Sequence, residues 1–577
     1  MLAGPIFSRE ALISPRQFRH FLIRSGYIAA LFVLMYTTLQ ATFGWQQVRN
    51  VGDIARFGNL IFQVLSLVQL TVVSFFALLF AAGNVAQEKD RQTLVLLLMT
   101  DLSNRELVLG KLFASLLIVA VLLAASAPAF FLVHLLGGVT LEQIGWTLAL
   151  SAATALAMGS WGMLVAYWRE STFQTLAISM LGAVLFVGAV EGAVAIAGDH
   201  SQIAYCIGLF NPFRALLRIL DPLGDTTQAT IGQVSALDSV LTMLGLAVVI
   251  IAVAIARVRV WNPSRSVYTA ALKQMAQEGE TRKAKSRDIW RNPVIWREIC
   301  TRAYGRRIFV IKLAYAAVAF AGAYSLWDAT GTQRLIMGMV GPVGFAFVGL
   351  SLVSLILINA QAVTALTSER DGKTLELFLM TDVTAKEFIF GKLGGILFNT
   401  KELILIPLVL LIFFAYRQSV SGEDLSYVII GFLILVAFAA MLGLHAGLSF
   451  ENSRSAIANS LGTMFFLFVG IFIFMILLVE ARSSFFLQFQ SFILFIGVGS
   501  IGLYSSLAHR NPSGALRISA GVLPFLTFYA ITQYLLGGNL SVCLSICAAY
   551  GFTTLAMLVP AISEFDVALG RTTLDKG

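Results

Sequence analysis

The sequence predicts an all-α polytopic membrane protein with two homologous halves of about six transmembrane helices each, plus shorter amphipathic helices. Three observations lead to this fold class. First, hydrophobic residues make up 58% of the 577 residues and charged residues only 12%. The mean hydropathy of +0.83 lies far from that of a soluble globular chain. Second, apolar runs of about 20 residues, each able to span roughly 30 Å of hydrocarbon, recur throughout. Third, one polar stretch occurs twice.

The repeated stretch reads EKDRQTLVLLLMTDLSNRELVLGKL at residues 88–112 and ERDGKTLELFLMTDVTAKEFIFGKL at residues 369–393. Glu369 follows Glu88 by 281 positions, and this offset is constant along the run. Ungapped similarity over such a length indicates an internal duplication, so the chain is interpreted as two halves.

The first half, residues 1–258, begins with an amphipathic segment at 1–26, in which arginines alternate with apolar residues. This pattern predicts a helix lying on the membrane, and its motif returns at 293–298. We expect no cleavable signal peptide, because no short apolar region with a small-residue cleavage site precedes the first long run. Spans are predicted near 27–46, 60–84, 110–137, 143–167, 173–197 and 238–258.

The charged opening of each repeated stretch predicts that the chain leaves the bilayer there, because ionised side chains are unfavourable in hydrocarbon. Asp90 and Asp371 are suitable N-caps for a short helix. Along that helix, apolar residues recur at i, i+3 and i+4, which gives one apolar stripe. The stripe comprises Leu94, Leu97 and Leu98 in the first copy and Leu375, Phe378 and Leu379 in the second.

A second helix is predicted after the short one. Ser103 with Glu106, and Thr384 with Glu387, have the spacing of a capping box. We expect the short helix to lie parallel to the membrane and to face a partner. The alternative is an interfacial helix that only anchors a loop, and two near-identical copies favour the partner.

Residues 259–292 are predicted to be a solvated cytoplasmic linker, because the stretch from Lys273 to Asp288 lacks apolar periodicity and carries mixed charge. The second half, residues 293–577, repeats the plan and then diverges, since the Asn-Pro motif at Asn211 returns at Asn511 with an offset of 300. The added residues are apolar, which leaves two interpretations open: an extra transmembrane hairpin or re-entrant helices. The predicted spans are 308–327, 338–364, 391–415, 427–449, 455–480 and 541–562, and the apolar stretches between the last two are 485–505 and 518–537.

The net charge of +9 does not indicate a nucleic-acid partner, because the Lys and Arg residues cluster beside apolar runs. This placement is the positive-inside signal. It predicts a bilayer as the surroundings, with both termini inside. Only the cluster at Arg214 and Arg218 falls on the predicted outer side.

The pattern E-[KR]-D-x-x-T-L-x-L-x-L-M-T-D-x-[ST], followed by G-K-L, resembles the coupling-helix region of ABC-2 type transporter permeases. The resemblance implies that the loop after the second span docks into a groove on a separate ATPase subunit. Unlike a usual family member, this chain carries both transmembrane halves, which implies that it binds two ATPase copies. The resemblance also implies that ATP binds to the ATPase subunits and that this chain holds no cofactor. The implied docking residues are Glu88, Asp90, Thr93, Leu94, Leu97 and Leu98, with Glu369, Asp371, Thr374, Leu375, Phe378 and Leu379.

The resulting expectation is the permease of an ABC exporter in a bacterial cytoplasmic membrane, working by ATP-driven alternating access. Few charges in the spans favour a hydrophobic or amphipathic cargo over a small ion. The alternative is an ion-driven secondary transporter of two six-helix halves, whose loop carries a tight basic turn with a glycine. Arg91 replaces Gly372 in the other copy, and the apolar run that follows has no place in that turn.

The sequence does not predict an enzyme. The GKT segment at 372–374 resembles the end of a Walker A loop, but a P-loop needs glycine where Thr367 stands. HExxH and GxSxG motifs are missing. Cys543 and Cys547, four residues apart on an apolar helix, are interpreted as packing residues. We therefore expect no catalytic residue, no cofactor site and no metal site.

Overall fold

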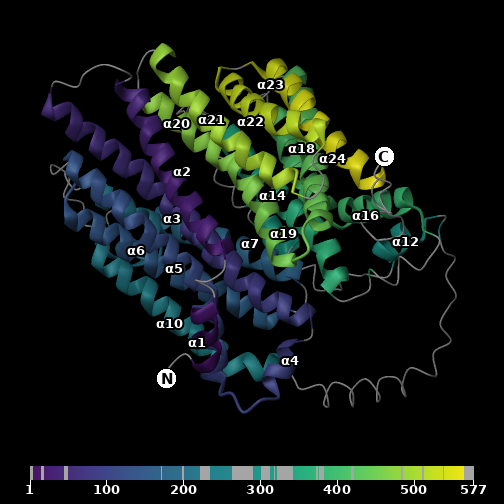
Figure 1. Cartoon of the computed structure of the whole chain (residues 1–577), viewed down its shortest axis with the longest axis horizontal. Helices are drawn as coiled ribbons and strands as arrows, with labels where there is room; N and C mark the ends of the chain where they lie inside the picture. The colour runs from purple at the N-terminus through teal and green to yellow at the C-terminus, as the bar shows by residue number, and fades with distance from the viewer. Residues whose placement is uncertain are drawn as a thin grey trace. The chain divides into compact units, whose positions relative to one another are not determined.

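In a computed structural model of the chain, the described residues form helices and contain no strand (Figure 1). Contacts divide the chain into two compact units: residues 1–282 with 477–495, and residues 283–476 with 496–577. Most of the predicted linker lies outside the described residues. The structure describes residues 4–13, 18–43, 50–91, 93–169, 172–197, 201–220, 234–262, 290, 292–300, 312–317, 319–320, 342–371, 375, 383–416, 422–481, 485–509, 513–536 and 538–563.

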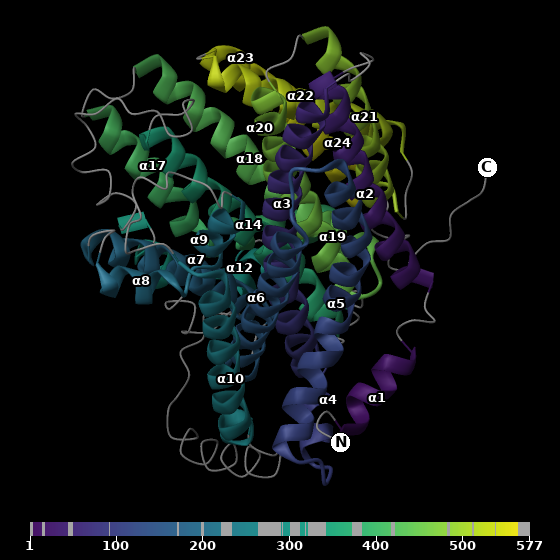
Figure 2. The same ribbon diagram turned by 90° about the vertical axis from the view of Figure 1, so that its left-hand side faces the viewer.

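In the first unit, the segment predicted as one amphipathic helix contains two helices. α1 (Gly4–Ile13) is separate, whereas α2 (Phe18–Phe43) continues into the predicted first span. Figure 2 shows α3, α5, α6 and α10 side by side, with the short α4 at one end of them. The other helices of this unit are α3 (Val51–Asp90), α4 (Thr93–Leu98), α5 (Asn104–Leu136), α6 (Leu141–Trp168), α7 (Thr172–Ala197), α8 (Gln202–Gly208), α9 (Pro212–Leu220) and α10 (Ala236–Trp261).

The second unit follows the same plan in its first part, and two of its later helices contain π-helical turns. It comprises α12 (Pro293–Cys300), α14 (Pro342–Asp371), α16 (Ala385–Asn399), α17 (Lys401–Tyr416), α18 (Gly422–Ser449), α19 (Ser453–Phe465), η4 (Phe466–Gly470), α20 (Ile471–Ala481), α21 (Phe485–Leu507), α22 (Gly514–Leu535), α23 (Asn539–Ile546), η5 (Cys547–Gly551) and α24 (Phe552–Ser563). Residues 477–495 of α20 and α21 belong to the first unit.

The all-α membrane fold is confirmed. Among the described residues, 11 helices are long and apolar enough to cross a membrane, or up to 13 if each of two bent helix pairs is one span. The exposed side chains of α10 also indicate a membrane environment, because Leu241, Val248 and Val249 are more than half exposed. Such a row of exposed aliphatic side chains suits lipid and not water. The chain is an integral multi-pass membrane protein.

A close helix crossing recurs in both units. A Cβ added to Gly162 of α6 would lie 2.7 Å from the carbonyl oxygen of Leu78 in α3. A Cβ added to Gly443 of α18 would lie 2.6 Å from the carbonyl oxygen of Asn359 in α14. Both pairs are related by the offset of 281 positions. Each crossing therefore requires glycine, because the two backbones meet with no room for a side chain.

The two halves differ after their fifth predicted span. In the first unit, α8 and α9 form a pair bent by 100°. In the second half of the sequence, α21 and α22 are each long and apolar enough to span a membrane by themselves. Of the two open interpretations, these lengths favour an extra transmembrane hairpin in the second half.

The bent pair also accounts for Arg214, one of the two basic residues that depart from the positive-inside pattern. The guanidinium of Arg214 in α9 donates to both carboxylate oxygens of Glu191 in α7, at 2.7 Å each. The side-chain amide of Asn211 donates to the same carboxylate at 2.6 Å. Arg214 is therefore neutralised locally, since a bidentate ion pair satisfies its charge.

Candidate functional site

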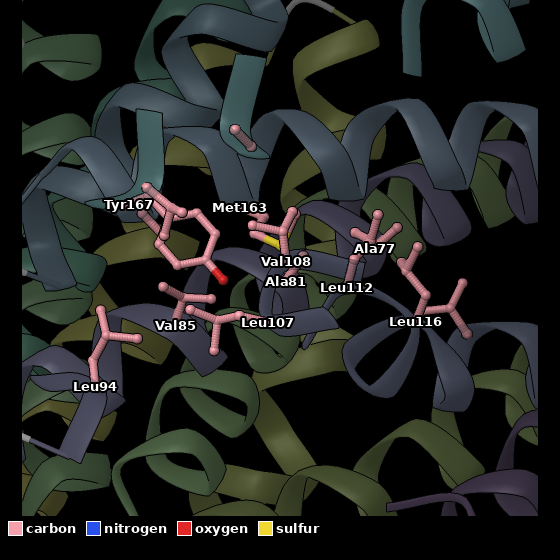
Figure 3. Close-up of a cluster of buried hydrophobic side chains, with 14 of the residues drawn as sticks. Ala77, Ala81, Val85, Leu94, Leu107, Val108, Leu112, Leu116, Met163 and Tyr167 are labelled. Atoms are coloured by element: carbon pink, nitrogen blue, oxygen red, sulfur yellow. The ribbon is translucent and has the colours of Figure 1, made fainter. Parts of the chain in front are cut away.

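The short helix α4 turns its predicted apolar stripe toward its own unit. Leu94 is 2% exposed and Leu98 is 8% exposed. Both belong to a hydrophobic cluster with Val85, Leu107 and Tyr167, and Figure 3 shows Leu94 near these three side chains. Leu97 packs partly buried against the same cluster. The resemblance implies that the stripe fills a groove on a partner, but in the structure it fixes α4 to the ends of α3, α5 and α6. Burial of these side chains stabilises the loop by removing apolar area from water.

The opposite face of α4 is free of such packing. Leu96 is 65% exposed and Met99 is 68% exposed. Thr93, another predicted docking residue, is also exposed, and its hydroxyl donates to the carbonyl oxygen of Glu88 at 3.2 Å. α4 and the residue that follows it, Met99, therefore present an apolar pair beside a hydroxyl, outside the buried cluster. Leu96 and Met99 were not among the predicted docking residues, because helical periodicity identifies a stripe but not the direction it faces.

The second copy of the short helix is described only in part. Leu375 is helical and half-buried. Asp371, the expected N-cap of this copy, is the last residue of α14. The predicted docking residues Thr374, Phe378 and Leu379 lie outside the described residues.

The predicted acidic docking residues make contacts inside their own units. In the first unit, Glu88 forms an ion pair with Lys111 of α5. Asp90 accepts a hydrogen bond from the hydroxyl of Thr172 at the start of α7. Asp90 is also the last residue of α3, so it does not cap α4, which begins at Thr93. The expected N-cap role of this aspartate is therefore wrong.

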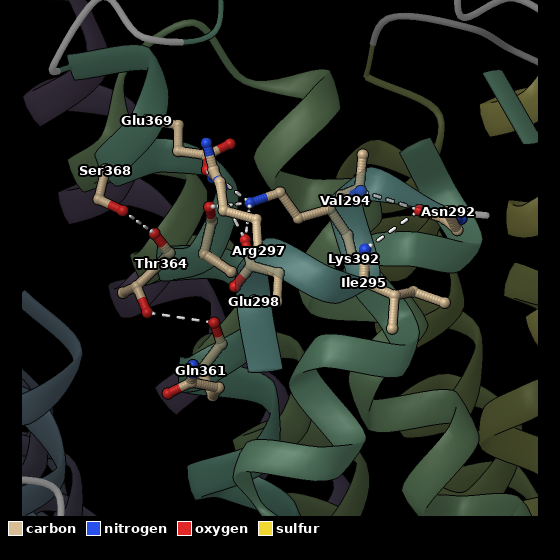
Figure 4. Close-up of polar contacts among 11 residues, drawn as sticks. Asn292, Val294, Ile295, Arg297, Glu298, Gln361, Thr364, Ser368, Glu369 and Lys392 are labelled. Carbon is tan, nitrogen blue, oxygen red and sulfur yellow. Dashed lines mark hydrogen bonds and ion pairs between the residues drawn. The ribbon is translucent and has the colours of Figure 1, made fainter. Parts of the chain in front are cut away.

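In the second unit, Glu369 belongs to a buried charge cluster (Figure 4). The ammonium nitrogen of Lys392 lies 2.7 Å from a carboxylate oxygen of Glu369 and 2.7 Å from one of Glu298. Arg297 is within ion-pair distance of both carboxylates. Two carboxylates and two cations give the cluster no net charge, which is what permits it to be buried.

The amphipathic helix before the second half supplies two members of this cluster. α12 carries Arg297 and Glu298, and its start is capped by Asn292, whose side-chain oxygen accepts from the backbone nitrogens of Val294 and Ile295 at 3.0 and 3.1 Å. The side-chain amide of Asn292 donates to the carbonyl oxygen of Glu387 in α16 at 2.9 Å. α12 is therefore tied to α16, which leads away from the repeated loop. A lysine repeated in an apolar helix was the sequence signal for this cluster, because such a lysine needs an acidic partner.

Both predicted capping boxes are confirmed. The hydroxyl of Ser103 accepts from the backbone nitrogen of Glu106 at 3.3 Å, and the backbone nitrogen of Ser103 donates to the Glu106 carboxylate at 3.0 Å. Thr384 and Glu387 make the same two bonds at 3.3 and 3.0 Å. Each box fixes the start of the helix after the loop, so the loop has a defined exit.

Other contacts hold the first loop against α10. The side chain of Arg259 donates to Asn104 at 2.7 Å and to the carbonyl oxygen of Leu102 at 3.0 Å. Asn104 in turn donates to the carbonyl oxygen of Ile255 at 3.1 Å. The loop with α4 is thus braced on several sides. Within the described part of the chain, no group of three or more His, Cys, Asp or Glu residues could hold a metal ion.

Comparison with known proteins agrees with this architecture. A family model described as "ABC-2 family transporter protein" matches residues 20–331, which is more than half of the chain. No curated protein and no solved structure matches the chain.

Proposed function

The chain belongs to the ABC-2 family of transporters, and on this premise we propose that it is the membrane-spanning subunit of an ATP-driven exporter that works with a separate ATPase. The observation that carries the proposal is the braced loop at the end of α3. Its helix α4 is fixed by buried leucines on one face and leaves Leu96 and Met99 exposed on the other. A rigid element with an unpartnered apolar face is suited to docking.

We propose that two ATPase copies bind, one at each repeated loop. In the first loop, the contact surface consists of Leu96 and Met99 with Thr93. In the second loop, the equivalent positions at the offset of 281 are Leu377 and Met380, which lie outside the described residues. The side chains at these positions are the same in the two copies, so one ATPase type serves both loops as a homodimer.

In this mechanism ATP is bound and hydrolysed on the partner. Closure of the ATPase pair draws the two loops together, and the motion passes along α3 and α5 and their counterparts α14 and α16. The protein lies in a bacterial cytoplasmic membrane with both termini inside, and its cargo is hydrophobic or amphipathic. The scarcity of charged residues in the long apolar helices supports this class of cargo.

Affinity purification of the tagged full chain from its native membrane tests the proposal. We expect an ATPase to co-purify, with two copies per chain by native mass analysis. Two different ATPase polypeptides per chain would refute the homodimer. Proton-driven transport by the purified chain alone in liposomes would refute the ABC mechanism in favour of a secondary transporter.

A further inference from the structure

Three consecutive residues at the end of α3 contact three different helices. Glu88 forms its ion pair with α5. Lys89 donates from its ammonium to the carbonyl oxygens of Tyr167 and Arg169 at the end of α6, at 2.6 and 2.9 Å. Asp90 accepts from the hydroxyl of Thr172, the first residue of α7.

The second unit repeats this arrangement with different side chains. Arg370 donates to the carbonyl oxygen of Gly447 at 3.0 Å and to that of Phe450, at the end of α18. Asp371 accepts from the hydroxyl of Ser453, the first residue of α19, at 2.6 Å. Phe450 and Ser453 follow Arg169 and Thr172 by the same 281 positions. Lysine is exchanged for arginine and threonine for serine, and the acceptor Gly447 lies one position before the counterpart of Tyr167. In both units a cation bonds the carbonyl groups at a helix end, and an aspartate accepts from the first hydroxyl of the next helix.

The chemistry of these contacts suits the helix ends at which they occur. The last carbonyl groups of a helix lack partners within the helix, and they carry the negative end of its dipole. A cation bonded to them is therefore favourable, and its hydrogen bonds are stronger than those between neutral groups. The basic residue thus holds the end of one helix, and the adjacent aspartate holds the start of the next.

Hydrogen bonds made by two adjacent residues restrain the junction more than those of either residue alone. They fix the α6–α7 junction to the end of α3 and prevent rotation about either contact. α4 begins only three residues after Asp90. A displacement of α4 must therefore carry the α6–α7 junction with it, unless these bonds break.

We propose that the pairs Lys89–Asp90 and Arg370–Asp371 are positioning residues that transmit the movement of the docking loop to the α6–α7 and α18–α19 junctions. This inference rests on the proposed function. It adds a second route of transmission to the one along α3 and α5. The helices after each junction, α7 and α19, then respond to ATP as directly as the helices that flank the loop.

The test uses the complex of the full chain with its ATPase, with the four native cysteines replaced. Spin labels are placed at Phe131→Cys on α5 and Val184→Cys on α7, two exposed positions of the first unit. The distance between them is measured by pulsed electron paramagnetic resonance before and after trapping with ADP and vanadate. We expect the label-to-label distance to change on trapping in the parent protein and to stay unchanged in Lys89→Met. The affinity of Lys89→Met for the ATPase should remain within about twofold of that of the parent.

Each unit supplies the conservative control for the other. Lys89→Arg installs the residue that the second unit uses, and it should keep the shift. Thr172→Val removes only the hydroxyl and should weaken the shift, whereas Thr172→Ser should preserve it. These milder variants keep the test valid if Lys89→Met fails to fold.

The outcomes separate the two proposals. Absence of a bound ATPase from the parent protein would refute the proposed function. A bound ATPase with no distance shift in the parent, or with the same shift in Lys89→Met and Thr172→Val, would overturn the transmission role alone. Such a result would make these residues a static brace for folding.

Discussion

Lys392 is buried against Glu369, with its ammonium nitrogen 2.7 Å from a carboxylate oxygen and its side chain 0% exposed. The equivalent pair in the first unit, Lys111 with Glu88, is 12% and 20% exposed. A buried pair of this kind is costly to break, because the remaining charge has no solvent to stabilise it.

The first prediction concerns this lysine. Lys392→Met should reduce the free energy of unfolding by roughly 3–5 kcal/mol, because two buried carboxylates, Glu298 and Glu369, would then share Arg297 as their one cation of the cluster. Thermal unfolding in detergent measures the change. Lys401→Met is the control, since Lys401 is exposed and its ammonium lies over the ring of Phe398. Equal stability of Lys392→Met and the control would contradict the buried cluster.

The second prediction separates the two faces of α4. Leu96→Asp and Met99→Asp should leave the chain folded and weaken ATPase binding by about a hundredfold, or roughly 3 kcal/mol, because a carboxylate would be buried at the interface. Leu141→Asp is the control, at a leucine that is 55% exposed just beyond the other end of α5. Leu94→Asp should instead prevent folding. Pull-down of the ATPase and gel filtration of the chain report binding and folding.

A contrary pattern for these variants is easy to recognise. If Leu94→Asp folds and loses the ATPase while Leu96→Asp binds normally, the stripe predicted from periodicity docks after all. α4 would then have to rotate on binding.

The third prediction concerns the repeated helix crossing. Gly162→Ala and Gly443→Ala should each destabilise the protein by about 1–3 kcal/mol, because the added methyl group meets a backbone oxygen that cannot move aside. Gly145→Ala, also in α6, meets nothing within 4 Å and should stabilise the helix slightly, by up to about 1 kcal/mol. Unfolding midpoints of the three variants check the order. An unchanged unfolding midpoint for Gly443→Ala would contradict the prediction, because it would show that α14 and α18 can move apart at little cost.

The fourth prediction concerns buried amides. Gln69 of α3 and Gln361 of α14 are 0% exposed, and neither amide atom of either residue has a hydrogen-bond partner in the part of the chain described here. Replacing each by leucine should raise stability by about 1–3 kcal/mol, because the desolvation of the amide is removed. Gln143→Leu, which breaks a capping box and a 2.9 Å bond to Ile219, should lower it by about 1 kcal/mol. Lower stability of Gln69→Leu would contradict this prediction, because it would show that the Gln69 amide has a hydrogen-bond partner in the protein.

The helical membrane fold, the approximate bounds of most spans and the starts of the helices after the two loops all follow from the amino-acid sequence. These features depend on interactions between residues close in the chain. Hydropathy over about 20 residues defines a span, and Ser103 with Glu106 are three positions apart, so a capping box is visible as a spacing. The constant offset of 281 likewise identifies matching positions in the two halves from the residue order alone.

The contacts of the loop residues, in contrast, depend on how distant segments come together in the folded chain. Asp90 looks like a helix cap in the sequence, but its partner is Thr172, 82 positions away. In the sequence, nothing distinguishes Lys89 from the charged residues beside it, and its bond to the end of α6 forms only in the folded chain. Leu94 is buried because it packs in one cluster with Tyr167 and Leu107. The physical reason is common to all three. The free energy of placing a charged or apolar side chain depends on its solvent exposure and its partners, and both come from segments distant in the sequence.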